Sequence, residues 1–427
     1  MGPMGAMSDF DMMNLPEALS KRVAAMGLST PTPIQAQAIP HALNGRDVMG
    51  LAQTGTGKTA AFGIPLIARL MEEGGRAAPK TARGLILAPT RELAGQIAQV
   101  LREMTEMKVQ IVVGGVSINP QIQRLSKGVD ILVATPGRLL DLVDRRAVRL
   151  NETGFLVLDE ADQMLDLGFV HDLRKIAKMM GDNRQTMLFS ATMPKQMAEI
   201  AASYLHEPLR IEVAPPGKAA DKVTQEVHFI AKAEKSALLI ELLGAHREER
   251  ALIFTRTKHG ADKLTKALDK AGYKVVAIHG NKRQGQRDRA LAAFKARDVL
   301  VMVATDVAAR GLDIPDVKHV YNFELPNVPE AYVHRIGRTA RAGKDGAAIA
   351  FCAPDEMPYL KDIQKIMKIR IPVASGRAWE EIPDPSVKPT GGRGRGRRRP
   401  GGAPKGPGGA KPSNNRRRKP KPKGPRT

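Results

Sequence analysis

The chain has 427 residues, and its 67 Lys and Arg against 44 Asp and Glu give a formal net charge of +23. This length supports two or three domains with substantial cores, and it excludes a small scaffold held together by disulfides. The single cysteine, Cys352, permits neither an internal disulfide nor a zinc site built from cysteines, and a charge of this size predicts a polyanionic partner.

The first residues show no targeting signal. Residues 1–7 lack the apolar core of a secretory signal, and we interpret them as an expression leader before a natural start at Met7. No apolar run approaches the roughly 18 residues of a membrane span, so we expect no membrane partner. Because a lone cysteine also suits a reducing compartment, we expect a cytoplasmic location.

Residues 8–212 alternate short apolar runs with amphipathic stretches of helical length. Runs that are apolar throughout are typical of strands covered on both faces, which indicates a parallel sheet flanked by helices. The predicted strands are residues 47–51, 85–87, 110–113, 131–133, 155–158 and 187–189, and predicted helices include residues 92–107 and 139–146.

Residues 213–222 interrupt the pattern with Pro215, Pro216 and Gly217, a composition typical of a linker between domains. A second α/β series follows over residues 223–372. The sequence therefore predicts an α/β fold with two consecutive parallel-sheet domains. The strands predicted in the second domain are residues 227–230, 252–254, 275–278, 299–303, 320–323 and 347–351.

Residues 373–427 form a predicted tail rich in Gly, Pro, Arg and Lys. Within it, residues 388–427 hold 15 basic and no acidic side chains, so they supply 15 of the 23 net charges. With almost no apolar side chain to bury, this basic tail is predicted to be disordered.

A candidate phosphate site follows the predicted strand 47–51. Glycines precede Lys58 and Thr59 there, a pattern typical of a loop whose backbone N–H groups and helix N-terminus bind phosphate oxygens. Lys58 would reach the β- and γ-phosphates and Thr59 would hold Mg²⁺, although Ala52 stands where this loop usually has its first glycine. An ordinary Gly/Thr turn is the alternative. The candidate ATP-binding residues are Ala52, Gln53, Thr54, Gly55, Thr56, Gly57, Lys58 and Thr59.

A second candidate site follows the predicted strand 155–158. Asp159 and Glu160 end this strand, at the sheet edge where α/β folds bind ligands. Asp159 is predicted to orient Mg²⁺, partly through water, and Glu160 to position or deprotonate an attacking water. The alternative is an acidic helix start, since carboxylates are stabilised at helix N-termini. The pairing with Lys58 favours the nucleotide site.

The four residues 159–162 spell the signature of the DEAD-box RNA helicases, and the chain resembles that family along nearly all of its body. Residues 27–35 resemble the family's Q motif, with Phe10 at the family's isolated aromatic position. The resemblance implies that Gln35 contacts the adenine edge, for which an amide offers donor and acceptor, and that Phe10 stacks on the base. A proline turn and a core phenylalanine are the alternatives for these residues.

Further motifs resemble RNA-contacting and coupling segments of the family. Their residue types suit contacts with sugar and phosphate rather than with bases. Taken singly, each motif is a common loop or a helix cap. The resemblance assigns RNA contacts to Pro89, Thr90, Arg91, Gly115, Thr135, Gly137, Arg138, Arg256, Gln284, Arg287 and Thr305. It assigns coupling between the ATP state and RNA to Asp162, Ser190, Ala191, Thr192 and His334.

Residues 332–341 resemble the family's arginine-finger motif, with Ala340 where many members carry glycine. The resemblance implies that Arg338 and Arg341 meet the γ-phosphate, a contact that can be worth roughly 10³–10⁵ in rate. It also implies that Asp313 contacts the ribose. A basic helix face is the alternative. Lys58 precedes the predicted linker and Arg338 follows it, so a catalytic site of this kind would form when two domains close.

The resemblance implies two tandem RecA-like domains of the P-loop NTPase class, helicase superfamily 2, with ATP and Mg²⁺ as cofactors. It implies RNA-stimulated ATP hydrolysis coupled to domain closure, with local, non-processive unwinding of RNA or remodelling of RNA–protein complexes. An RNA clamp or chaperone with little turnover, a processive DNA helicase and a small-molecule kinase are the alternatives. The basic tail is most similar to the bacterial RhlE-like branch, which implies ribosome precursors or RNA-decay machinery as partners.

Overall fold

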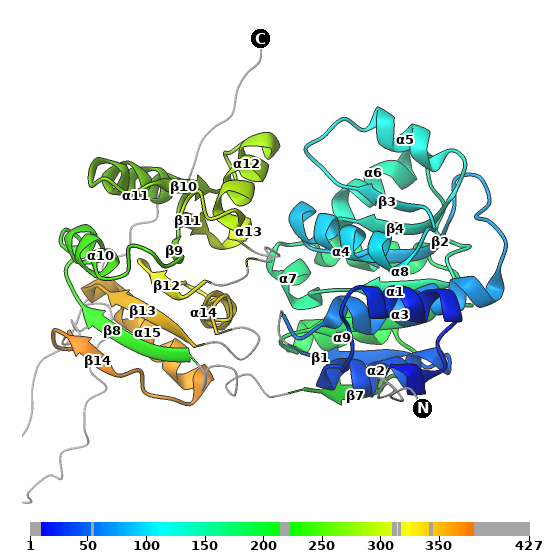
Figure 1. Ribbon diagram of the computed structural model, residues 1–427, viewed down its shortest axis with the longest axis horizontal. Coiled ribbons are helices and arrows are strands. Elements are labelled where there is room, and N and C mark those ends of the chain that lie inside the picture. The colour runs from blue at the N-terminus through cyan, green and yellow to red at the C-terminus, as the bar shows by residue number, and fades with distance from the viewer. Residues whose placement is uncertain are drawn as a thin grey trace, which may run out of the picture. The chain divides into compact units, whose positions relative to one another are not determined.

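The computed structural model describes residues 10–52, 55–213, 223–309, 314, 317–340 and 345–379. Within these residues the chain forms two seven-stranded sheets, and all the strand pairings are parallel (Figure 1). The predicted α/β class with tandem parallel sheets is confirmed. The predicted expression leader, most of the linker and the basic tail beyond Trp379 lie outside the described residues.

The first sheet has the strand order β3-β4-β2-β5-β6-β1-β7. Its strands are β1 (Val48–Leu51), β2 (Ala82–Leu87), β3 (Val109–Val112), β4 (Val129–Ala134), β5 (Phe155–Leu158), β6 (Gln185–Ser190) and β7 (Leu209–Glu212). The helices of this domain are η1 (Asp11–Met13), α1 (Glu17–Ala25), α2 (Pro33–Leu43), α3 (Lys58–Glu73), α4 (Arg91–Met104), α5 (Asn119–Leu125), α6 (Pro136–Asp144), α7 (Ala161–Asp166), α8 (Val170–Met179) and α9 (Lys195–Tyr204).

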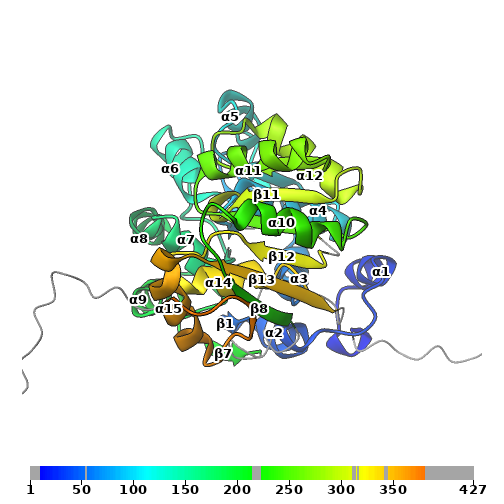
Figure 2. The same cartoon turned by 90° about the vertical axis from the view of Figure 1, so that its left-hand side faces the viewer.

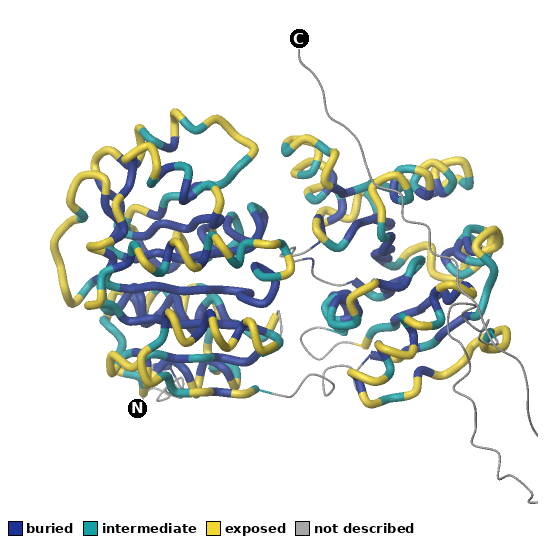
Figure 3. The backbone as a smooth tube through the Cα atoms, turned by 180° about the vertical axis from the view of Figure 1, so that it is seen from behind, coloured by how far each residue is buried: buried dark blue, intermediate teal, exposed yellow. Residues whose placement is uncertain are grey.

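The central strands are apolar at every position because both faces of the sheet are covered. In β5, Phe155 and Val157 belong to a core that includes α2, α3 and α4, whereas Leu156 and Leu158 belong to a second core with α6, α8 and α9. Successive side chains of a strand point to opposite faces, so two helical layers require an uninterrupted apolar run. Figure 3 shows the strands buried and the outer helix surfaces exposed.

The second sheet repeats the arrangement with the order β10-β11-β9-β12-β13-β8-β14 (Figure 2). Its strands are β8 (Val223–Phe229), β9 (Ala251–Thr255), β10 (Val275–Ile278), β11 (Val301–Thr305), β12 (His319–Asn322), β13 (Gly346–Cys352) and β14 (Val373–Ser375). The helices are α10 (Lys235–Gly244), α11 (Lys258–Lys270), α12 (Gln284–Lys295), α13 (Asp306–Ala309), α14 (Pro329–Ile336), η4 (Pro354–Glu356) and α15 (Met357–Met367).

Two edge strands, β7 and β14, have no counterpart among the predicted strands. β14 pairs with β8, and Trp379 Nε1 donates a hydrogen bond to the Cys352 carbonyl at 3.0 Å. Residues 373–379 therefore lie with the second sheet, whereas the sequence placed them in the tail. The reason is that β14 is three residues long and exposed at each of them, so it carries no apolar run.

No helix among the described residues is long and apolar enough to cross a membrane.

Candidate nucleotide and RNA sites

The motifs singled out in the sequence follow the carboxyl ends of strands. The phosphate loop follows β1, Asp159 follows β5, and Ser190 ends β6. β6 pairs with β1 on one side and with β5 on the other, so the carboxyl ends of the three strands are neighbours. Parallel strands finish at one edge of a sheet, so these loops converge although they are far apart in sequence. In the second sheet, Arg256 follows β9 and Thr305 ends β11.

The phosphate loop ends where α3 begins at Lys58. Gly57 caps this helix with a φ of 89°, and Gly55 has the same left-handed φ. A side chain at Gly57 would also collide with Gln35, since an added Cβ would lie 2.5 Å from Gln35 Nε2. Position 57 therefore needs glycine for its backbone conformation and for its contact with α2.

Gln35 fastens the Q-motif segment to the phosphate loop. Its Oε1 accepts a hydrogen bond from Thr32 N at 2.9 Å, and its Nε2 donates to the Gly57 carbonyl at 3.0 Å. The Thr32 hydroxyl donates to the Thr56 carbonyl at 2.8 Å. A glutamine amide has two N–H groups and an oxygen with two lone pairs, so Gln35 keeps one donor and one acceptor for a ligand.

Lys58 and Asp159 form the buried charged centre of the loop. The Lys58 Nζ lies 3.6 Å from Asp159 Oδ1, with the two side chains 5% and 3% exposed, and it also donates to the Ala52 carbonyl at 3.3 Å. Burial raises the pKa of Asp159 to about 6; the Lys58 ammonium opposes this shift and the Glu160 carboxylate adds to it. A carboxylate this desolvated is stabilised by any cation that reaches it.

Glu160 follows Asp159 in a strained backbone conformation, with φ 51° and ψ 50°. Left-handed backbone is unfavourable for a residue with a side chain, and such strain is typical of functional sites. The Glu160 amide donates to Asp159 Oδ1 at 3.0 Å, so the two acidic residues hold each other in place. Glu160 is buried, and α7 begins at the next residue. This backbone conformation is not evident from the residue pattern.

Asp162 joins α7 to the end of β6. Its Oδ2 accepts hydrogen bonds from the backbone N–H groups of Ala191 and Thr192 at 3.1 and 2.9 Å, and from the Thr192 hydroxyl at 3.0 Å. The Ser190 hydroxyl accepts from Asp162 N and donates to the Thr192 carbonyl. His334 Nε2 lies 3.8 Å from the same Oδ2. The five residues predicted to couple ATP state to RNA thus meet at Asp162: Ala191, Thr192 and His334 lie at its carboxylate, and Ser190 contacts its backbone N–H.

The predicted RNA-contacting loops of the first sheet also lie together. Thr90 caps α4 by accepting a hydrogen bond from Leu93 N, and Thr135 stands at the start of α6. The Arg91 guanidinium covers Gly115, where an added Cβ would lie 1.8 Å from Arg91 Nη1. Arg138 donates from both terminal nitrogens to the Val116 carbonyl at 3.1 and 3.2 Å. Two arginines therefore brace the glycine loop after β3.

Gln284 and Arg287 on α12 contact residues of the first sheet. Gln284 accepts from Arg91 Nη1 at 3.3 Å and donates to Glu92 at 3.2 Å, and Arg287 Nη2 lies 3.0 Å from the same Glu92 oxygen. The sequence assigned Glu92 no role. Arg256, the remaining basic residue predicted for RNA, donates to Asn327 and lies over the Tyr359 ring at 5.5 Å.

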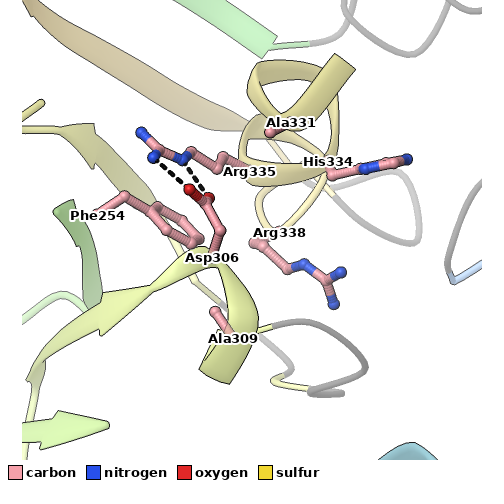
Figure 4. A pocket seen from close by; sticks show the side chains of 7 residues that line it. All are labelled: Phe254, Asp306, Ala309, Ala331, His334, Arg335 and Arg338. Atoms are coloured by element: carbon pink, nitrogen blue, oxygen red, sulfur yellow. Dashed lines mark hydrogen bonds and ion pairs between the residues drawn. The ribbon is translucent and has the colours of Figure 1, made fainter. Parts of the chain in front are cut away.

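The arginine motif on α14 contains a buried arginine, Arg335, to which the sequence analysis assigned no role. Arg335 is 1% exposed and makes a two-pronged ion pair with Asp306, at 2.6 and 2.7 Å. It also donates to Asn322 Oδ1 and to the Glu324 carbonyl. Figure 4 shows this pair in a pocket, with the Arg338 side chain extending away from it and His334 one turn earlier on α14. The sequence did contain one indication that Arg335 is buried: Tyr332, Arg335 and Ile336 have the spacing of residues on one face of a helix, and all three are buried.

Several predicted residues are placed elsewhere or lie outside the description. Phe10 is 2% exposed in the core of the first domain, which matches the alternative of a core phenylalanine, and its stacking on a base stays a prediction. Gln53, Thr54, Asp313 and Arg341 lie outside the described residues. The structure thus brings together the phosphate loop, the acidic residues and the coupling residues, and leaves part of the proposed triphosphate contacts undescribed.

The fold and the motifs at the carboxyl-end edge of the first sheet define a P-loop nucleotide hydrolase with two parallel-sheet domains. The DEAD/DEAH box helicase family matches residues 32–200, and the helicase conserved C-terminal domain matches residues 234–343. The chain belongs to the DEAD-box ATP-dependent RNA helicases. The ATP-dependent RNA helicase CshA of Listeria monocytogenes is 44% identical over 378 residues, which cover 88% of this chain and 72% of that protein.

Other similar proteins are also helicases by name. The DEAD-box ATP-dependent RNA helicase CshA of Bacillus cereus is 44% identical over 365 residues, covering 85% of this chain and 69% of that protein. Among solved structures, S. cerevisiae Dbp5 bound to RNA and ADP BeF3 superposes with a TM-score of 0.78 at 33% identity, covering 87% of this chain and 96% of that chain. These similarities span both sheets and confirm tandem RecA-like helicase domains.

Proposed function

We propose that this chain hydrolyses ATP at the loop after β1 and couples the hydrolysis to RNA held at the same sheet edge. The observation that carries the proposal is the buried pair of Lys58 and Asp159, 3.6 Å apart at the start of α3. A lysine at the end of the phosphate loop and a carboxylate after β5 of the same sheet are the charges that a metal-bound triphosphate needs. In this proposal Lys58 binds the β- and γ-phosphates.

Mg²⁺ fits the donors present. Asp159 is a buried carboxylate whose pKa is raised to about 6 by burial, so a divalent cation would favour its ionised form. Mg²⁺ prefers oxygen ligands, and Thr59 and Asp159 would supply a hydroxyl and a carboxylate, the latter partly through water. When bound, the ion neutralises charge on the phosphates. Glu160 would orient the attacking water and accept its proton.

Arg338 is the proposed contact from the second domain. It lies on the turn after α14, beside a helix that Arg335 anchors to Asp306, and it is 3% exposed. Together with Arg341 it would meet the γ-phosphate when the domains close. Asp162 links α7 to the Ser190–Thr192 segment and to His334, which supports a route by which closure is sensed at β6. RNA contacts would then change with the ATP state.

The proposed RNA contacts suit backbone rather than base recognition. Thr90, Gly115, Thr135 and Arg138 offer hydroxyls, main-chain N–H groups and charge, which bind sugar and phosphate without sequence preference. The expected outcome is local, non-processive unwinding or remodelling of RNA–protein complexes. Ribosome precursors and RNA-decay machinery remain the proposed settings, with a cytoplasmic location. The relatives reported above are named CshA, so placement in the RhlE-like branch stays a prediction.

Replacing Glu160 by glutamine tests the proposed chemistry. Glu160→Gln keeps the size and shape of the side chain, but it replaces one acceptor oxygen with an NH2 donor and removes the carboxylate that would accept the proton. We expect ATP binding within about twofold of wild type and turnover at least about 100-fold lower, since general base catalysis typically contributes 10²–10⁴-fold. ATP affinity is measured by fluorescent-nucleotide titration, and turnover by phosphate release with single-stranded RNA present.

Glu152→Gln is the matched control, because Glu152 is an exposed residue in a loop before β5. It removes one carboxylate and should leave turnover unchanged. Undiminished turnover in Glu160→Gln would reject the assigned base. If wild type itself fails to hydrolyse ATP under every RNA condition, the chain is an RNA clamp rather than a helicase.

A further inference from the structure

A cluster of two histidines and a glutamate lies at the edge of the second sheet opposite to the helicase motifs. His319 is the first residue of β12 and pairs with Ala251, the first residue of β9. His246 and Glu249 lie in the turn that joins α10 to β9. Because parallel strands begin at one edge and end at the other, these side chains meet at the amino ends of the strands, away from Arg256 and Thr305.

The donor atoms of the cluster converge. One ring nitrogen from each histidine and one Glu249 carboxylate oxygen all lie within 4.8 Å of one another. His319 Nε2 is 2.5 Å from Glu249 Oε2, and His246 Nδ1 is 3.7 Å from the same oxygen. No other group of three such side chains with this spacing occurs in the part of the chain that the structure describes.

The donor chemistry of the cluster suits a cation. Glu249 offers a carboxylate oxygen and the two histidines each offer a ring nitrogen, which are ligand types that a divalent transition metal accepts. Metal ligands must be deprotonated, so each histidine would bind as a neutral imidazole. Lys318, next to His319 in the sequence, carries a charge that would repel a cation.

One ligand of the cluster is buried and the other two are partly exposed to solvent. His319 is 8% exposed, and its Nδ1 has no hydrogen-bond partner among the described residues. His246 and Glu249 have side chains 43% exposed, so a cation and a water can reach the cluster from solvent. The two imidazole rings now stack with centroids 4.1 Å apart.

We propose that His246, Glu249 and His319 form a binding site for a divalent transition-metal cation of the Zn²⁺ class, with solvent at the fourth position. Two imidazoles and one carboxylate are a ligand set that Zn²⁺ accepts in tetrahedral sites, whereas Mg²⁺ prefers oxygen ligands alone. The bound cation would tie the turn before β9 to the start of β12. It would not take part in the nucleotide site, and its role would be to stabilise the second domain.

The test is titration of the chelator-treated full chain with Zn²⁺ by calorimetry, together with Co²⁺ absorption as a spectroscopic probe of the ligands. We expect one saturable site per chain and a rise in the melting temperature as Zn²⁺ fills it. His246→Ala and Glu249→Gln should each weaken binding about tenfold or more, since even outer-shell changes cost about 10–100-fold. His319→Gln should do the same wherever circular dichroism shows it folded.

His171→Ala is the matched control, because His171 is an exposed histidine on α8 of the first domain. It should leave affinity, stoichiometry and the Co²⁺ spectrum unchanged. The absence of saturable binding would overturn the proposal. Binding that His246→Ala and Glu249→Gln leave unchanged would also overturn it, since the cation would then sit on other histidines of the chain.

Discussion

Single residues at the nucleotide edge are placed against their own conformational or solvation preferences. Glu160 has left-handed backbone and Asp159 is a carboxylate that is 2% exposed, and both features cost stability in the free chain. Gly57 has left-handed backbone that glycine accepts, but Gln35 leaves no room for a side chain there. The cost makes sense if a metal-bound triphosphate supplies compensating contacts, which is why the first two predictions concern these residues.

The raised pKa of Asp159 predicts a pH dependence of stability. Its pKa is about 6 in the folded chain against an ordinary value of 3.8. Between these values the folded state holds more protons than the unfolded state, so this residue favours folding at acid pH and loses that contribution as pH rises through 6. Without nucleotide or Mg²⁺, the unfolding free energy of wild type relative to Asp159→Asn should fall by on the order of 1–3 kcal/mol from pH 4 to pH 7.

Denaturant unfolding of both proteins at several pH values provides the measurement. The difference between the two proteins is the informative quantity, because all other titrating groups are shared. Parallel pH profiles would show that Asp159 titrates near its ordinary value and that burial does not control it.

Gly57 and Gly45 allow a matched test of the loop. Both have left-handed φ values, 89° and 78°, but an added Cβ meets Gln35 at position 57 and nothing within 4 Å at position 45. Each alanine substitution should cost about 1–2 kcal/mol from its backbone alone. Only Gly57→Ala should also displace Gln35 and weaken ATP binding, by about tenfold or more, which is about 1.4 kcal/mol. Equal ATP affinities for the two variants would contradict the proposed role of the contact between the Q-motif segment and the loop in ATP binding.

At the scale of elements, α14 is anchored by a polar contact rather than by apolar packing alone. Arg335 satisfies Asp306, Asn322 and the Glu324 carbonyl from inside the domain, and its guanidinium lies 5.0 Å from the Phe254 ring centroid. A lysine keeps the charge but cannot form the two-pronged contact. The orientation of α14, and with it the position of Arg338, therefore depends on this polar contact as well as on the buried Tyr332 and Ile336.

Arg335→Lys should lower the unfolding free energy of the second domain by about 2–4 kcal/mol, because charge-assisted hydrogen bonds in a buried site are lost. Arg145→Lys is the comparison, since Arg145 makes an ion pair with Asp141 at the surface and should change stability by less than about 1 kcal/mol. Urea unfolding measures both. A loss for Arg335→Lys no larger than for Arg145→Lys would show that α14 does not depend on the buried pair.

Elements were predictable where they carry long apolar runs. β5 and its acidic end were evident in the sequence because a strand buried on both faces is apolar throughout. β7 and β14 were missed because edge strands bury one face or none, and a three-residue strand has no period to detect. Arg335 and Glu92 were missed for a different reason: these buried residues pair with the partly buried Asp306 and Arg287, which come from distant segments, and only the fold brings each pair together.

For the whole molecule, the phosphate loop and the acidic motif to which we assign the nucleotide chemistry follow strands of the first sheet, and the proposed contact Arg338 belongs to the second domain. The basic tail, which supplies most of the net charge, lies largely outside the described residues and stays a predicted electrostatic tether for RNA. Some motif residues are held by contacts with other motif residues or their neighbours, such as Asp162 with Thr192 and Glu92 with Arg287.

Coupling between ATP and RNA is the central claim, and steady-state ATP hydrolysis with and without single-stranded RNA tests it most directly. We expect turnover that is slow alone and rises at least about tenfold, or 1.36 kcal/mol in the activation free energy, at saturating RNA. Single-stranded DNA of the same sequence serves as the comparison and should stimulate less, because RNA differs by its 2′-hydroxyls. Turnover that is the same with RNA, with DNA and without nucleic acid would contradict the account.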